Sequence, residues 1–125
     1  MQIEQPKYQQ EYVTFINAYN KGVTSGEDVG FVIARLAQYY AETNLHYANA
    51  LIFYNKIAST IEETSDSATG KPISSTKAKA LASATPESND LTIAKAHVEN
   101  IDQMINALKS LQKGILNEWA HMGIS

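Results

Sequence analysis

The fold of this chain is decided by the stretch VGFVIARLAQYYAETNLHYANALIFYNKIASTI, which spans residues 29–61. Apolar and aromatic residues recur in it at alternating steps of three and four positions, the spacing of a coiled-coil seam on one long helix. The seam has two heptad lines: Ile33, Tyr40, Tyr47, Tyr54 and Ile61 on one, and Val29, Leu36, Thr43, Ala50 and Ile57 on the other. The stretch therefore predicts a single helix with a continuous apolar face.

A second stretch, residues 91–122, repeats the same pattern at nearly the same length. Its two heptad lines are Leu91, Val98, Ile105, Gln112 and Trp119, and Ala94, Ile101, Leu108, Ile115 and Met122. Two long helices joined by a connector can lie antiparallel, so that each covers the apolar stripe of the other. The two stretches together predict an all-α fold built on a long antiparallel helical hairpin that resembles a coiled coil.

Helix start and stop signals divide the rest of the chain. A one-sided apolar stripe after Pro6 predicts a short N-terminal helix that ends before Gly22, and Thr85 followed by Pro86 predicts the start of the last helix. The expected elements are a short helix at about residues 6–20, a long helix at about 26–64, a connector at 65–85 with a short helix at about 75–83, and a long helix at about 86–122. We expect one helical domain over residues 1–125, similar to a three-helix bundle and oligomeric.

Composition excludes several classes of site. The 125 residues contain no cysteine, which excludes disulfides, thiolate zinc sites and a cysteine nucleophile. No apolar run approaches the length of a membrane span, and the first residues lack the apolar core of a signal peptide. The formal net charge of −3 gives no general attraction to nucleic acid or to anionic membranes. We expect a soluble protein with no membrane partner that stays in the cytoplasm, or in the host cytoplasm if the protein is viral.

The middle of the first long helix is apolar on more than one side over residues 45–54. A helix of that kind is covered on more than one side, and the hairpin partner covers only one. The first helix, the connector or another subunit could supply the other cover, and we favour a second copy of the chain. The candidate surface for this contact is formed by Tyr40, Tyr47, Leu51 and Tyr54. The tyrosines could instead stack on bases or line a ligand pocket, but their spacing of seven favours packing.

Charge is distributed unevenly along the chain. Residues 1–70 carry four lysines and arginines against eight acidic residues, whereas residues 71–125 carry six against five. A candidate patch for anions or nucleic acid lies at the connector end of the hairpin and consists of Lys71, Lys77, Lys79 and Lys95. Such a patch can meet the phosphates of a nucleotide or of single-stranded DNA, or an acidic partner protein. The Gly70–Lys71–Pro72 turn lacks the pattern of a phosphate-binding loop.

A metal site and a catalytic site are not expected. Glu118 and His121 have the E-x-x-H spacing of ferritin-like di-iron proteins, but such a site needs a second pair of this kind and two further carboxylates. The remaining candidates, Glu42 with His46 at a spacing of four and Glu11, do not form a second pair. His97, beside the last seam, is interpreted as a structural residue. No catalytic triad or carboxylate pair has a recognisable spacing, so we expect no enzyme activity, no metal and no cofactor.

One resemblance adds to this interpretation. The chain combines a tyrosine-rich long helix, a Gly-Lys-Pro turn followed by KAKA at residues 77–80, and AKAHVE at 94–99 leading to LKSLQ at 108–112. In this order the elements resemble small helical-hairpin accessory proteins encoded in tailed-phage genomes. Some of those proteins lie near recombination or single-strand-annealing genes, and others are counter-defence or virion components. The resemblance implies a viral accessory role and carries over no catalytic residue.

The functional hypothesis from the sequence is a non-enzymatic interaction or assembly protein that acts through protein–protein contacts as a homo-oligomer. Two alternatives stay open. One is an accessory protein that binds single-stranded nucleic acid through the connector lysines. The other is an oligomeric counter-defence sponge that holds an anionic nucleotide between its subunits.

Overall fold

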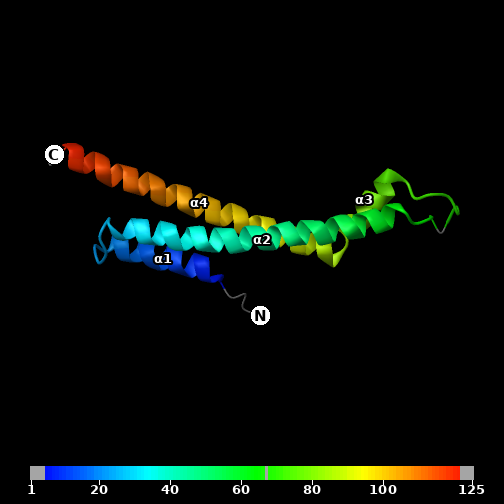
Figure 1. The fold of residues 1–125 in the computed structure, drawn as a ribbon, viewed down its shortest axis with the longest axis horizontal. Coiled ribbons are helices and arrows are strands. Elements are labelled where there is room, and N and C mark those ends of the chain that lie inside the picture. Colours follow the sequence, from blue (N-terminus) through cyan, green and yellow to red (C-terminus); the bar gives the residue numbers. More distant parts are fainter. Residues whose placement is uncertain (1–4, 67, 122–125) are drawn as a thin grey trace. The chain divides into compact units, whose positions relative to one another are not determined.

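The computed structural model describes residues 5–66 and 68–121, and it is helical throughout (Figure 1). Its elements are α1 (Lys7–Asn20), α2 (Asp28–Glu62), α3 (Ser75–Ser83) and α4 (Pro86–His121). Over these ranges the only β-type pairing is an isolated antiparallel bridge between Ser65 and Pro72. The prediction of an all-α fold with two long and two short helices is confirmed at this level. Met122, placed by the sequence on the second seam, lies outside the described residues.

The helix boundaries follow local capping chemistry. Pro6 precedes α1, and Gly22, with a φ of 72°, follows its end. The Ser74 hydroxyl accepts the backbone N–H of Lys77 at 3.2 Å at the start of α3, and the Thr85 hydroxyl accepts that of Ser88 at 3.2 Å at the start of α4. These two caps mark the start of α3, within the connector, and the start of α4, directly after it.

The start of α2 is capped in a different way from α3 and α4. The carboxylate of Asp28 accepts the hydroxyl of Thr24 and the backbone N–H of Ser25, the latter at 3.3 Å. Thr24 therefore donates a hydrogen bond here and does not act as an accepting cap. The Thr24 hydroxyl first, and then the Ser25 N–H, hold the pKa of Asp28 below its usual value. An ionised carboxylate at this position also suits the positive end of the helix dipole.

The chain forms two compact units. Unit 1 comprises Met1–Glu42 and Glu99–Ser125, and unit 2 comprises Thr43–Val98. The helices α2 and α4 each contribute one stretch to each unit, because their bounds cross from one to the other. The expectation that residues 1–125 form one domain stays a prediction.

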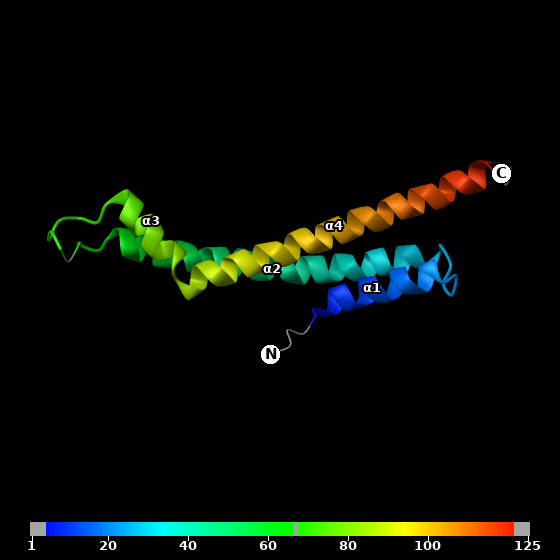
Figure 2. The same ribbon diagram turned by 180° about the vertical axis from the view of Figure 1, so that it is seen from behind.

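Unit 1 is organised around large apolar side chains from three helices. Its buried cluster consists of Tyr8, Phe15, Val29, Leu36, Ile101 and Leu108. Figure 2 shows α1 lying along the first turns of α2. Gly26, just before α2, and Gly30, in its first turn, lie beside the later turns of α4: a Cβ atom at Gly26 would lie 2.8 Å from Cδ1 of Ile115, and one at Gly30 would lie 3.9 Å from Nε2 of Gln112. Within this unit the two long helices therefore run in opposite directions, and residues of both predicted seams pack together.

Unit 2 is built differently, around small side chains. Its buried hydrophobic residues are all alanine: Ala50, Ala78, Ala82 and Ala94. Larger apolar residues of the same unit are exposed, with Leu45 at 64%, Ile52 at 52% and Phe53 at 59% of their accessible surface. Alanine contacts let helices approach closely, but they remove little apolar area from water. Unit 2 thus leaves part of its bulky apolar surface uncovered by its own residues.

Over the described residues, no helix contains a stretch that is long and apolar enough to cross a bilayer.

Candidate functional site

The predicted tyrosine surface lies along one side of α2. Tyr40 is half-buried and packs against the cluster of unit 1. In unit 2, Tyr47 and Tyr54 are also half-buried, whereas Leu51, between them, is 38% exposed. Part of the surface of each of the three tyrosines is therefore covered by other residues of the same chain. Their role in a contact with a partner stays a prediction.

A second exposed line of residues on α2, which sequence reasoning missed, lies away from the buried line of the helix. We call it the back stripe, and its eight positions, all exposed, are Phe31, Ala34, Gln38, Ala41, Leu45, Ala48, Ile52 and Asn55. Ala34 lies two positions from the buried Leu36, and Ala48 and Ile52 each lie two positions from the buried Ala50. Two positions correspond to about 200° around a helix, so the stripe faces away from the buried line. The alternating spacing of three and four positions between these residues is the sequence pattern from which the back stripe could have been predicted.

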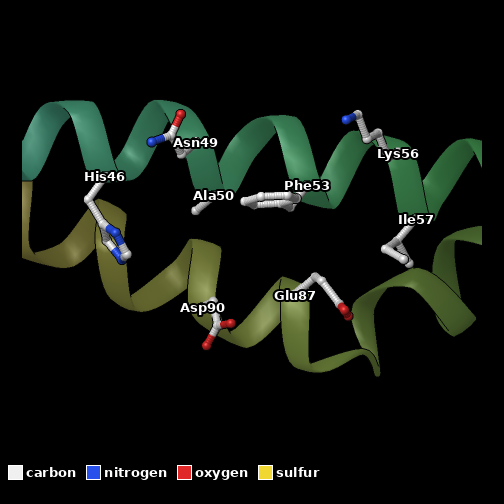
Figure 3. Close-up of a pocket in the computed structure, with 8 residues that line it drawn as sticks. All are labelled: His46, Asn49, Ala50, Phe53, Lys56, Ile57, Glu87 and Asp90. Carbon is white, nitrogen blue, oxygen red and sulfur yellow. The ribbon is translucent and has the colours of Figure 1, made fainter.

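A groove with charged walls lies within unit 2 between α2 and α4 (Figure 3). It has a volume of about 660 Å³. Its lining consists of His46, Asn49, Ala50, Phe53, Lys56 and Ile57 from α2, and Glu87 and Asp90 from α4. Lys56 places its Nζ 6.0 Å from the centre of the Phe53 ring, within the range of a cation–π contact. The groove offers apolar surface flanked by a cation from one helix and two carboxylates from the other.

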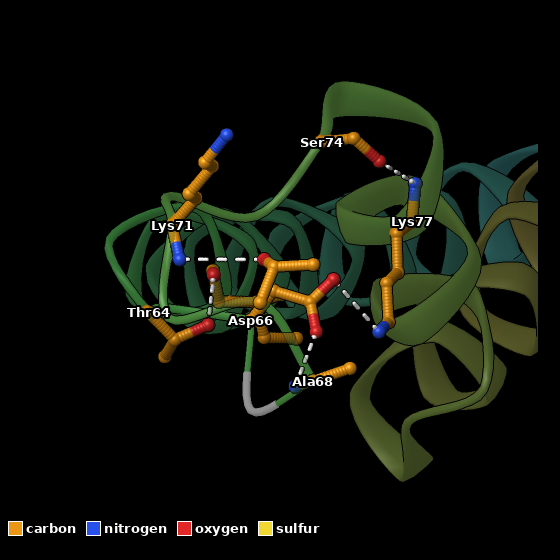
Figure 4. A network of polar contacts seen from close by, with 8 residues as sticks. Thr64, Asp66, Ala68, Lys71, Ser74 and Lys77 are labelled. Carbon is orange, nitrogen blue, oxygen red and sulfur yellow. Dashed lines mark hydrogen bonds and ion pairs between the residues drawn. The ribbon is translucent and has the colours of Figure 1, made fainter.

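The connector of unit 2 is folded by a network of polar contacts around Asp66 (Figure 4). The Asp66 backbone N–H donates to the carbonyl of Lys71 at 2.7 Å, and its carboxylate accepts the backbone N–H of Ala68 at 2.9 Å. The same carboxylate pairs with Nζ of Lys77 at 3.1 Å. Gly70, with a φ of 69°, makes the tight turn and donates its N–H to the Asp66 carbonyl at 2.7 Å.

This network changes the character of the predicted lysine patch. Lys71, Lys77, Lys79 and Lys95 are all exposed and all belong to unit 2, as a basic surface requires. Lys77, however, is paired with an acid that sequence reasoning did not include. Asp66 places a negative charge beside Lys77, which weakens the attraction of this lysine for phosphate. Anion binding by the patch stays a prediction.

The pKa of the Asp66 carboxyl is lowered in the folded chain, first by the Ala68 N–H and then by the Lys77 ammonium. The contribution of this carboxylate to stability is therefore fully present above the unfolded pKa, about 3.9, and is lost as the pH falls through the lower folded value. We expect an NMR titration to give Asp66 a pKa below 3.9 and to show that Lys77→Met raises it. Lys79→Met is the matched control and should leave this pKa unchanged. An Asp66 pKa that does not respond to Lys77→Met would contradict the ion pair.

Among the described residues, the candidate metal ligands are not brought together. The described part of the chain contains no group of three or more histidine, cysteine, aspartate or glutamate residues that could hold a metal ion. Glu11 is paired instead with Arg35, at 2.6 Å between Oε1 and Nη2. This hydrogen bond and the charge of Glu11 raise the pKa of Arg35. The structure does not describe the side chains of Trp119 and His121. The E-x-x-H pair of Glu118 and His121 therefore lies partly outside the described residues.

Comparison with known proteins identifies no relative. No protein-family model matches the sequence, and no curated protein and no solved structure matches the chain.

Proposed function

We propose that this protein is a non-enzymatic helical interaction and assembly protein that acts through protein–protein contacts of α2. The observation that carries the proposal is the composition of unit 2, where the buried residues are alanines while Leu45, Ile52 and Phe53 remain exposed. Covering a leucine, isoleucine or phenylalanine side chain completely contributes about 1.5–3 kcal/mol. A protein surface that covers these three side chains would supply the apolar burial that unit 2 lacks.

We also propose a specific arrangement of the helices and of the copies of the chain. In it, α2 and α4 form an antiparallel, coiled-coil-like hairpin, and α1 completes an arrangement similar to a three-helix bundle. Copies of the chain associate into a homo-oligomer. The opposite directions of α2 and α4 in unit 1 support the hairpin, as does the groove that both helices line in unit 2. A viral accessory role in a host cytoplasm belongs to the same proposal, and its support is the resemblance to tailed-phage hairpin proteins.

The test is the solution mass of the purified chain, measured by light scattering on a sizing column over a range of concentrations. We expect a stable oligomer. The double variant Leu45→Glu/Ile52→Glu places two charges in the exposed apolar surface of unit 2 and should reduce the mass to that of one chain. Leu116→Glu, at a leucine of similar exposure on α4, is the control and should leave the oligomer intact. Circular dichroism would verify that all variants keep their helix content.

Two outcomes would contradict self-assembly. One is a chain that stays monomeric at every concentration. The other is a monomer whose mass increases on addition of single-stranded DNA and no longer does so after Lys77→Glu/Lys79→Glu. That second result would favour the nucleic-acid alternative, since it depends on the connector lysines and on charge.

A further inference from the structure

The back stripe of α2 has a regular alternation of bulky and small residues. The bulky positions are Phe31, Gln38, Leu45 and Ile52, and the small positions between them are Ala34, Ala41, Ala48 and Asn55. None of the eight carries a charge, and Phe31 is 74% exposed. The stripe lies along one uninterrupted helix, Asp28–Glu62, and covers about three and a half heptads. That length is within the range at which heptad repeats indicate a coiled coil.

The alternation distinguishes between the two ways in which a pair of such helices can lie. In a parallel pair each position meets itself, so leucine faces leucine in one layer and alanine faces alanine in the next. The thick and thin layers then prevent close packing along the whole length. In an antiparallel pair the order of the steps is reversed in the second helix, and bulky positions fall opposite small ones. Leu45 then faces Ala41 or Ala48, depending on the heptad register, and every layer has a similar thickness.

The same alternation identifies the partner. A two-fold interface is self-complementary, because residue i of one copy contacts residue j of the other and the reverse contact also exists. The back stripe has equal numbers of bulky and small positions in strict alternation, so it is the complement of its own reversed copy. The neighbouring exposed positions Ala37, Asn44 and Leu51 on one flank are also uncharged, so two copies meet there without like-charge repulsion.

We propose that the back stripe binds the back stripe of a second copy of this chain in antiparallel orientation, with Leu45 and Ile52 each packed against an alanine of the partner helix. This inference rests on the proposed assembly function and assigns the surface, the partner and the direction of the contact. Leu45 and Ile52, which the chain itself leaves exposed, become buried in the pair.

Substitution of Ala41 tests the orientation because the two arrangements give opposite results. In the antiparallel pair Ala41 faces Leu45 or Ile52, so Ala41→Leu overfills that layer, and we expect dimer affinity to fall at least tenfold. In a parallel pair the same change would fill a thin layer and strengthen the dimer. Ala107→Leu, at an exposed position on α4, is the matched control and should change affinity less than threefold. Sedimentation at several concentrations measures all three dissociation constants.

Disulfide cross-linking gives a second measurement. The chain has no native cysteine, so only the introduced cysteines can form a disulfide. Ala34→Cys chains mixed with Ile52→Cys or Ser59→Cys chains should form a mixed disulfide in a redox buffer, and the partner that reacts fixes the heptad register. Ala34→Cys alone should not form a cross-linked dimer, and neither should Ala107→Cys, an exposed position on α4. Rapid self-cross-linking of Ala34→Cys, or a stronger dimer with Ala41→Leu, would overturn the antiparallel pair while leaving self-assembly in place. A chain that is monomeric throughout would overturn the assembly function itself.

Discussion

Replacement of Leu108 with alanine is expected to lower the free energy of unfolding of unit 1 by about 2–5 kcal/mol. Leu108 is 1% exposed and belongs to the cluster that joins α1, α2 and α4. Truncation removes its contacts and leaves a cavity that the surrounding helices fill only in part. Chemical denaturation followed by circular dichroism measures the change.

The chain offers a matched control for this prediction. Leu116 lies on the same helix and in the same unit, but it is 57% exposed. Leu116→Ala removes the same atoms from a site that is already in water, so its effect should stay within about 0.5 kcal/mol. Equal losses for the two variants would contradict the assignment of Leu108 to the core of unit 1.

Substitution of Ala94 with leucine is expected to destabilise unit 2 by about 1–3 kcal/mol. Ala94 is 1% exposed and is one of four buried alanines, so the added side chain has no space unless the helices move apart. Ala96→Leu, two positions further along the same helix at an exposed site, is the control and should be close to neutral. Thermal unfolding monitored by circular dichroism compares the two. A neutral Ala94→Leu would mean that the helices of unit 2 do not approach each other closely at this point.

The helices and much of the core could be predicted from the sequence, since heptad spacing determines which residues share a face. Leu36 and Ala50 on α2, and Ala94, Ile101 and Leu108 on α4, belong to predicted seam lines, and all are buried. Start signals were equally informative, because the cap at Thr85 depends on residues within one turn. The predicted bounds differ from those of the structure by two residues or fewer.

The sites were less predictable, for two physical reasons. Asp66 and Lys77 are eleven residues apart, and their pairing depends on the path of the connector, which no helical period describes. The back stripe has a regular spacing, but α2 carries heptad lines on opposite sides. Periodicity alone does not tell which of them the chain covers. Only the burial of Leu36 and Ala50, against the exposure of Leu45 and Ile52, separates the two.

The alanine core of unit 2 has a mechanical consequence. A leucine that projects between the side chains of a neighbouring helix opposes axial sliding, because it must leave one hole before it enters the next. Alanine projects very little and has no side-chain rotamers to reorganise, so surfaces made of it slide past each other with a low barrier. Where the four buried alanines of unit 2 meet neighbouring helices, we therefore expect less resistance to axial displacement than in the cluster of unit 1, which contains leucine, isoleucine and phenylalanine.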